Sequence, residues 1–270
     1  MLLRQAVKTL LLPLAPFLRE RRAGVTLLLY HRVSGDLGLE LDLAAPVFER
    51  QLRHLCARRL VVSLEEGLAL LQGAGPLAHD RCVLTFDDGY ADLFEAVFPL
   101  LAGLRLPATV YVTTGFVEGR AHSPLSGPLP DGVRPLTWTM LREMHASGLV
   151  TVGAHSHAHR EYVGLDAREV AEDIARSDAL FARHLGFVPQ HFAYPRARFD
   201  AVAESVVRRR YASAAVGGGA KAVPGACDPH RLPRVPVRRS DGMLFFAAKV
   251  RGLLAGEERL AAWARAARRR

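Results

Sequence analysis

Two groups of side chains in the sequence could hold a metal ion and move a proton. Asp87 and Asp88 directly follow the apolar run CVLTF, and the segment GAHSHAH places three histidines within five positions. Two histidines and one carboxylate, with positions left open for water, form the ligand set of a catalytic zinc site. If the chain turns helical after the preceding strand, His155 and His159 share one face and can bind one ion, while His157 points elsewhere.

The paired carboxylates could divide two tasks between them. Adjacent residues that leave a strand point in different directions, so one acid can bind the metal while the other accepts a proton from metal-activated water. Taken alone, Asp-Asp-Gly is equally consistent with a solvated turn, since aspartate and glycine favour turns. The histidine cluster favours the metal site.

These residues fall where expected strands end. Apolar runs typical of strands cover residues 25–31, 82–86, 108–114, 149–155, 191–195 and 211–216. Apolar residues at helical spacing cover residues 46–60, 90–104, 137–148, 166–186 and 200–210. Strands that alternate with helices predict an α/β protein of parallel units, arranged as a barrel or a doubly wound sheet. In both architectures function sits where strands end and loops begin.

Composition and charge narrow the classes of partner. The 270 residues are 50% hydrophobic, which is enough to bury a full core. The formal net charge is +9, and basic residues gather at the two ends of the chain. We interpret these ends as solvated faces, with a peripheral membrane contact through the basic N-terminus as the alternative. Binding of nucleic acid is not expected, because the chain has no recognition motif and no interleaved aromatic platform.

The cysteines and the N-terminal residues bear on the compartment. Three widely spaced cysteines predict neither a disulfide framework nor a cysteine-based zinc site, and they fit a reducing compartment. Residues 1–22 carry basic residues before a short apolar run without a small-residue cleavage site, and the run is too short to span a bilayer. We expect a cytoplasmic protein with an amphipathic opening helix, and contact of this helix with a membrane is the alternative to a solvated helix. An uncleaved export signal is the alternative.

Several motifs, in order, resemble those of the polysaccharide deacetylases, the NodB-like family of carbohydrate esterases. TFDDGY at 85–90 and HSHAH at 155–159 resemble the first two motifs of that family. The resemblance extends over residues 25–240 through LLLYHRV, FERQLRHL, LPATVYVTTGF and FAYP. The pair Tyr30-His31 is similar to the N-terminal strand of a permuted subgroup of the family.

The resemblance implies a fold, a reaction and a cofactor. It implies a distorted (β/α) barrel of about seven parallel strands. It also implies a divalent metal cofactor, with zinc as the first expectation and cobalt or nickel as the alternatives. It implies hydrolysis of N-acetyl groups on amino sugars of a polysaccharide or glycan, such as a cell-envelope polymer. We accordingly divide the chain into a basic amphipathic extension (1–24), a catalytic domain (25–245) and a basic C-terminal helix (246–270).

The resemblance also implies roles for single residues of the two lead motifs. Asp87 is expected to be the general base. Asp88, His155 and His159 are expected to bind the metal. Ser156 would steady the loop between the histidines by hydrogen bonding. Under these roles metal-activated water attacks the amide carbon and Asp87 takes its proton.

Three further assignments concern the oxyanion, the proton for the leaving amine and a partner for the base. The FAYP stretch is expected to supply a backbone N–H to the oxyanion hole, which on alignment falls at Arg196. His31 is expected to be the general acid or its partner, with His230 as the alternative. Arg234 is a candidate partner of the base, because no arginine stands at the position that pairs with the base in many relatives.

The third motif departs from the family pattern. The family has a Pro-Tyr-Gly or Tyr-Pro-Tyr-Gly turn, whereas this chain has Arg196 and Ala197 in the last two places. The missing glycine could shift the turn, and Arg196 would favour an anionic, for example phosphate-linked, sugar. Two alternatives to a polysaccharide deacetylase therefore stay open. They are a deacetylase or deformylase of a lipid-linked sugar, and a catalytically silent carbohydrate-binding relative.

Overall fold

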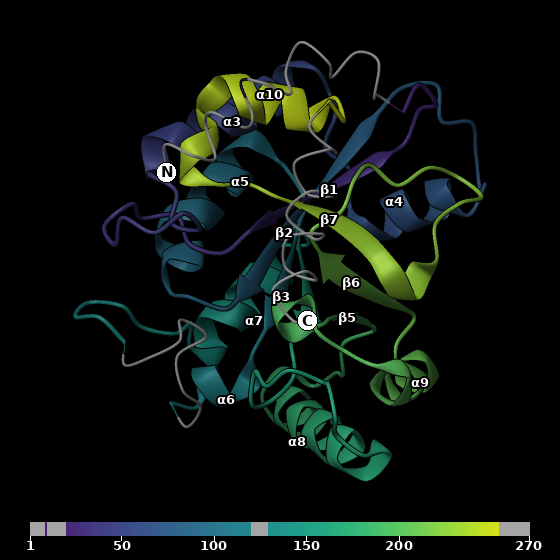
Figure 1. Ribbon diagram of the computed structural model, residues 1–270. Coiled ribbons are helices and arrows are strands. Elements are labelled where there is room, and N and C mark those ends of the chain that lie inside the picture. Colours follow the sequence, from purple (N-terminus) through teal and green to yellow (C-terminus); the bar gives the residue numbers. More distant parts are fainter. Residues whose placement is uncertain (1–8, 10–19, 120–128, 254–270) are drawn as a thin grey trace. The chain divides into compact units, whose positions relative to one another are not determined.

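Seven parallel strands form a closed barrel in chain order. The computed structural model describes residue 9 and residues 20–119 and 129–253. The strands, labelled in Figure 1, are β1 (Val25–Tyr30), β2 (Arg81–Asp88), β3 (Ala108–Val112), β4 (Val150–Ala154), β5 (His191–Ala193), β6 (Ser213–Gly217) and β7 (Leu232–Pro236). This confirms the expected α/β barrel and excludes the doubly wound sheet.

The chain divides into two compact units. One consists of Met1–Leu84, Gly217–Cys227 and Pro233–Arg270, and the other of Thr85–Val216 and Asp228–Leu232. Both paired acids and all three clustered histidines belong to the second unit.

The first unit pairs the first strand with the last. β1 runs parallel to β7, with Leu27 opposite Arg234. Within its described residues, the helical elements are α3 (Ala45–Ala57), α4 (Leu64–Leu71), the 3-10 turn η4 (Arg239–Asp241) and α10 (Gly242–Val250). The buried Lys249 ammonium donates to Asp241 and to the Pro236 carbonyl, each at 2.8 Å, so this charge is both paired and hydrogen-bonded.

The second unit holds α8, the longest helix among the described residues, and the strands around the acids and histidines. The helical elements described in this unit are the π-helix η1 (Leu93–Val97), α5 (Phe98–Leu104), α6 (Thr114–Val117), α7 (Trp138–Ala146), α8 (Ala167–Leu185), the 3-10 turn η2 (Pro195–Ala197), α9 (Ala201–Arg210) and the 3-10 turn η3 (Pro229–Arg231). A capping box starts α8, because the Asp166 carboxylate accepts from the Glu169 amide and Glu169 accepts from the Asp166 amide. Gly186 ends it at φ +80°.

The expected elements are present, with informative differences at their ends. Residues 90–104, expected as one helix, form η1 followed by α5, because Pro99 has no amide hydrogen to donate back into the preceding turn. The short helices α4 and α6 were not expected from the apolar spacing. β2 is longer than the apolar run and contains Asp87 and Asp88 as its last two residues.

The terminal segments lie largely outside the described residues. Of the expected N-terminal helix only residue 9 is described, and α10 starts ahead of the expected C-terminal helix, whose residues 254–270 are not described. The three-part division of the chain, the cytoplasmic location and the membrane contact therefore stay predictions. No helix within the described part of the chain is long and apolar enough to cross a membrane.

Candidate metal centre

Asp88, His155 and His159 converge within the second unit. Their ligand atoms all lie within 4.8 Å of one another. Nε2 of His159 lies 3.2 Å from Oδ1 of Asp88, and Nε2 of His155 lies 3.6 Å from the same oxygen. All three side chains are more than nine-tenths buried. The structure thus brings together the three residues predicted to bind a metal.

The tautomer of His155 suits a metal ligand. Its Nδ1 lies 2.7 Å from the carbonyl oxygen of Ala193, at the end of β5. A carbonyl oxygen only accepts, so Nδ1 carries the hydrogen and the lone pair of the neutral ring is on Nε2, which faces Asp88. Metal-binding histidines are commonly fixed in this way by a hydrogen bond from the other ring nitrogen.

The two carboxylates approach the same imidazole. Oδ2 of Asp87 lies 3.7 Å from Nε2 of His155, close to the corresponding distance from Asp88. Both acids therefore lie near the imidazole of His155. Asp88 has a φ of +78° and Gly89 a φ of +93°, and this left-handed backbone breaks the alternation of the strand.

Charge supports a cation at this place. Asp87 and Asp88 are each only 3% exposed, and they are neighbours in the chain. Adjacent buried carboxylates are costly unless positive charge and hydrogen bonds offset their desolvation and repulsion. A divalent ion bound by nitrogen and oxygen ligands supplies such a charge. The donor set therefore fits a divalent metal.

A loop, and not a helix, brings the two histidines together. Residues 155–160 contain no helical turn, so the helix that was expected to bring His155 and His159 together is not formed. Ser156 has a φ of +66° and His159 a φ of +50°, which curl the chain back on itself. The Ser156 hydroxyl accepts a hydrogen bond from the His159 amide at 2.9 Å, as expected for a residue that steadies the loop.

The third histidine of the cluster, His157, forms hydrogen bonds with residues of α6. Nδ1 of His157 lies 3.0 Å from the hydroxyl of Thr114, at the start of α6. The carbonyl of His157 accepts from the Gly115 amide at 2.9 Å. His157 thus anchors the loop to α6, which agrees with the expectation that it points away from His155 and His159.

Sequence reasoning missed one residue of this region, Asp173. Its buried carboxylate accepts hydrogen bonds from the amides of His157 and Ala158. The available signal was an acid on the apolar face of α8, between Val170 and Ile174, because such a position normally carries an apolar side chain.

The third-motif turn forms without its glycine. Arg196 and Ala197 have φ values of +54° and +53°, in the region that glycine adopts at no cost. The Ala197 amide donates to the Tyr194 carbonyl at 3.0 Å. Arg196 itself is exposed. Two successive non-glycine residues at positive φ mark a strained segment that the surrounding contacts must hold.

Glycine at position 197 is expected to stabilise the protein. Ala197→Gly removes the left-handed strain, and the gain is partly offset by the greater freedom of glycine in the unfolded chain, which leaves about 0.5–1 kcal/mol. Urea unfolding measures the difference. Ala179→Gly on the exposed side of α8 is the matched control, and it should destabilise by about 1 kcal/mol. Equal destabilisation by both substitutions would show that the turn is unstrained.

The predicted acid and the partner of the base belong to the first unit. His31 directly follows β1 and is half-buried, and its Nδ1 has no hydrogen-bond partner in the described part of the protein. Arg234 lies on β7 and is 1% exposed. Both assignments stay predictions.

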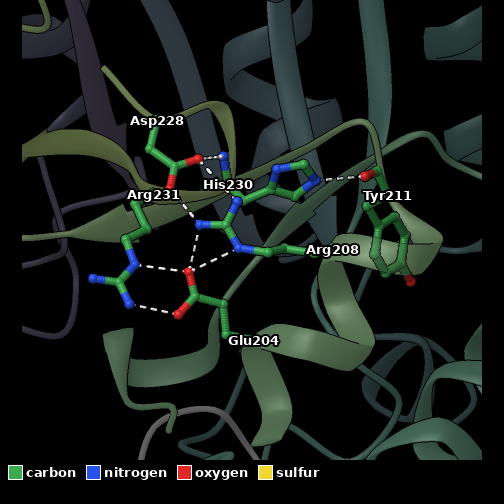
Figure 2. A network of polar contacts seen from close by, with 6 residues as sticks. All are labelled: Glu204, Arg208, Tyr211, Asp228, His230 and Arg231. Atoms are coloured by element: carbon green, nitrogen blue, oxygen red, sulfur yellow. Dashed lines mark hydrogen bonds and ion pairs between the residues drawn. The ribbon is translucent and has the colours of Figure 1, made fainter. Parts of the chain in front are cut away.

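His230, the alternative acid, lies in a polar network that joins α9 to the segment before β7 (Figure 2). Its Nε2 lies 2.8 Å from the Tyr211 carbonyl, so this nitrogen carries the hydrogen and donates it to the backbone. Glu204 accepts from Arg208 and from Arg231 at 2.5–3.0 Å, and Arg208 also pairs with Asp228.

The network remains charged at neutral pH. Hydrogen bonds from Arg231 and then from Arg208 lower the pKa of Glu204 to about 2. Proton donation by His230 would break its bond to the backbone, which favours a structural part for this histidine.

The comparison with protein families decides the classification. The family model described as polysaccharide deacetylase matches residues 74–212, just over half of the chain. The chain belongs to the polysaccharide deacetylase family. Membership of this family explains why the acids at the end of β2 and the histidines after β4 occur together in one chain. The finer placement in a permuted subgroup stays a prediction.

Solved structures share the fold of this polysaccharide deacetylase family member. IcaB from Ammonifex degensii matches with a TM-score of 0.73 and 27% identity, over 85% of this chain and 97% of that one. The deacetylase PplD of Streptococcus pyogenes matches with a TM-score of 0.70 and 19% identity, and the match covers 85% of this chain and 99% of the PplD chain. The barrel is therefore the deacetylase fold.

Two curated relatives match over part of their length. YxkH of Bacillus subtilis (strain 168), whose name assigns it to the polysaccharide deacetylases, is 26% identical over 184 residues, 67% of this chain and 60% of that protein. The poly-β-1,6-N-acetyl-D-glucosamine N-deacetylase of Escherichia coli (strain K12) is 30% identical over 135 residues, 48% of this chain and 20% of that protein. The chain thus spans less than two thirds of either relative.

Proposed function

We propose that this protein is a metal-dependent hydrolase that removes N-acetyl groups from amino sugars of a polysaccharide or glycan. The observation that carries the proposal is the convergence of Asp88, His155 and His159, with Nε2 of His155 left as an acceptor by its bond to the backbone. The similarity to the Escherichia coli poly-β-1,6-N-acetyl-D-glucosamine N-deacetylase supports the acyl group and the sugar class.

In the proposed reaction, Asp88, His155 and His159 hold the metal. When bound, a divalent metal lowers the pKa of water toward neutrality and polarises a carbonyl oxygen. Asp87 accepts the proton of the attacking water, and its buried position beside His155 keeps the carboxylate close to the reacting atoms.

Two further groups complete the proposed reaction. The backbone N–H of Arg196 donates to the oxyanion, a role that depends on the backbone and so tolerates the arginine side chain. His31 gives a proton to the leaving amine. The exposed Arg196 guanidinium would favour substrates with an anionic group near the scissile amide.

Acetate release from short N-acetylglucosamine oligomers tests the proposed reaction. Protein stripped by a chelator should release no acetate, and added zinc or cobalt should restore release, because the attacking water needs the ion. Oligomers that carry formyl groups serve as the comparison. Metal-independent release would contradict the proposed mechanism. Release of formate alone by the metal-loaded protein would contradict the proposed acyl group.

A further inference from the structure

The carboxylate of Asp173 binds three donors around the histidine loop. Oδ2 accepts from the His157 amide at 3.0 Å and from the Tyr162 hydroxyl at 2.7 Å. Oδ1 accepts from the Ala158 amide at 3.1 Å. Both amides belong to the stretch between His155 and His159, so one side chain of α8 holds the backbone that joins two candidate ligands.

The position of Asp173 is unusual for an acid. It is 7% exposed and lies on the buried face of α8, next to Val170 and Ile174. A buried carboxylate is tolerated when hydrogen bonds replace its lost water, and here three donors do so. An apolar residue would satisfy the packing of α8 but would leave the two loop amides without their acceptor.

The loop needs such an anchor because its own conformation is strained. Ser156 and His159 both have positive φ values, which persist only where surrounding contacts hold them. Thr114 and Gly115 hold one side of the loop through His157. Asp173 holds the same stretch through the amides of His157 and Ala158.

Tyr162 extends the anchor to the third-motif turn. Its amide donates to the Arg198 carbonyl at 2.9 Å, and its own carbonyl accepts from the Asp200 amide at 3.0 Å. Its hydroxyl donates to Asp173. A continuous chain of hydrogen bonds therefore runs from the histidine loop, through Asp173 and Tyr162, to the segment that directly follows Arg196 and Ala197.

We propose that Asp173 is a positioning residue that sets the metal affinity of the Asp88, His155 and His159 site and fixes the histidine loop relative to the third-motif turn. The inference rests on the proposed function, in which these three residues hold a divalent metal. Asp173 touches neither metal nor substrate and acts through the backbone of residues 157 and 158.

Zinc affinity of the Asp173→Asn variant tests this inference. The amide is the same size as the carboxylate, but its NH₂ group would face a hydrogen-bond donor where an oxygen now accepts. Competition with a chromophoric chelator, on the metal-stripped 270-residue chain, should show zinc binding weakened about 10- to 100-fold, the usual effect of losing a residue that orients a metal ligand. Hydrogen exchange at the amides of His157 and Ala158 should be faster in the metal-free variant than in the metal-free wild type.

Two further variants separate positioning from general stability. Asp178→Asn, on the same helix, removes a carboxylate that pairs with Arg210 at 2.6 Å and does not contact the loop, and it should leave zinc affinity unchanged. Tyr162→Phe keeps both loop amides on Asp173 and should weaken zinc binding about threefold. This variant serves as the test if Asp173→Asn does not fold.

The outcomes distinguish this inference from the proposed function. Zinc binding by Asp173→Asn within twofold of wild type would overturn the positioning role, even if the variant melted at a lower temperature. Equal weakening by Asp178→Asn would also overturn it, because the effect would then be one of helix stability. A wild type that binds neither zinc nor cobalt would overturn the proposed function, and the inference with it.

Discussion

Replacement of Asp88 by alanine is expected to abolish metal binding and, with it, acetate release. Asp88 is the only carboxylate in the group of three side chains whose ligand atoms converge among the described residues. Its loss leaves two neutral imidazoles, which bind a divalent ion far more weakly. Zinc affinity should fall by at least about 100-fold, as measured by chelator competition and by metal content after dialysis.

The control for this substitution is Asp131→Ala, which removes an exposed aspartate of the second unit. It should leave both zinc affinity and acetate release at the wild-type level. Retention of zinc by Asp88→Ala at wild-type affinity would show that the ion, if bound, has other ligands.

Replacement of Asp87 by alanine is expected to have the opposite pattern, with the metal kept and turnover lost. Asp87 lies 3.7 Å from Nε2 of His155 but is not one of the three convergent ligand residues. General base catalysis contributes about 10²- to 10⁴-fold, and kcat should fall by that factor. Paired measurements of zinc affinity and acetate release on the same preparation give both quantities.

The comparison between the two variants tests how the adjacent acids divide their roles. Asp87→Asn keeps the size of the side chain and should reproduce the loss of turnover seen with Asp87→Ala. If Asp87→Ala lost zinc as fully as Asp88→Ala, both carboxylates would be ligands, and the base would have to be another residue.

Local patterns were sufficient to predict most of the strands and longer helices and the clustering of the two acids with the histidines. The alternation of apolar runs with helical spacing predicts parallel β/α units, and strand ends of such units gather at one edge. Asp87, Asp88 and His155 lie at strand ends, so their approach follows from position in the chain. The resemblance to the polysaccharide deacetylases then selected the barrel over the doubly wound sheet.

Backbone geometry was not predictable in the same way. The spacing of His155 and His159 predicts a helix that brings them together, whereas the chain uses a loop with two positive φ values. Periodicity reports which residues share a face of a regular element. It carries no information about a loop whose conformation depends on contacts with α6 and α8.

Hydrogen bonds between residues far apart in the chain could not be predicted from the spacing of apolar residues either. Asp173 lies 14 to 18 positions after the two histidines it serves, on a helix that the pattern predicts correctly. A single acid on an apolar face has many explanations until its donors are seen. The left-handed φ of Asp88 is likewise a property of the folded barrel.

Anomalous diffraction at the zinc absorption edge, from crystals of the zinc-loaded protein, tests the central claim most directly. The account predicts one strong peak about 2.0–2.2 Å from Nε2 of His155, from Nε2 of His159 and from a carboxylate oxygen of Asp88, the usual zinc distances for these ligands. A protein that binds zinc but shows its peak away from these three side chains would contradict the account.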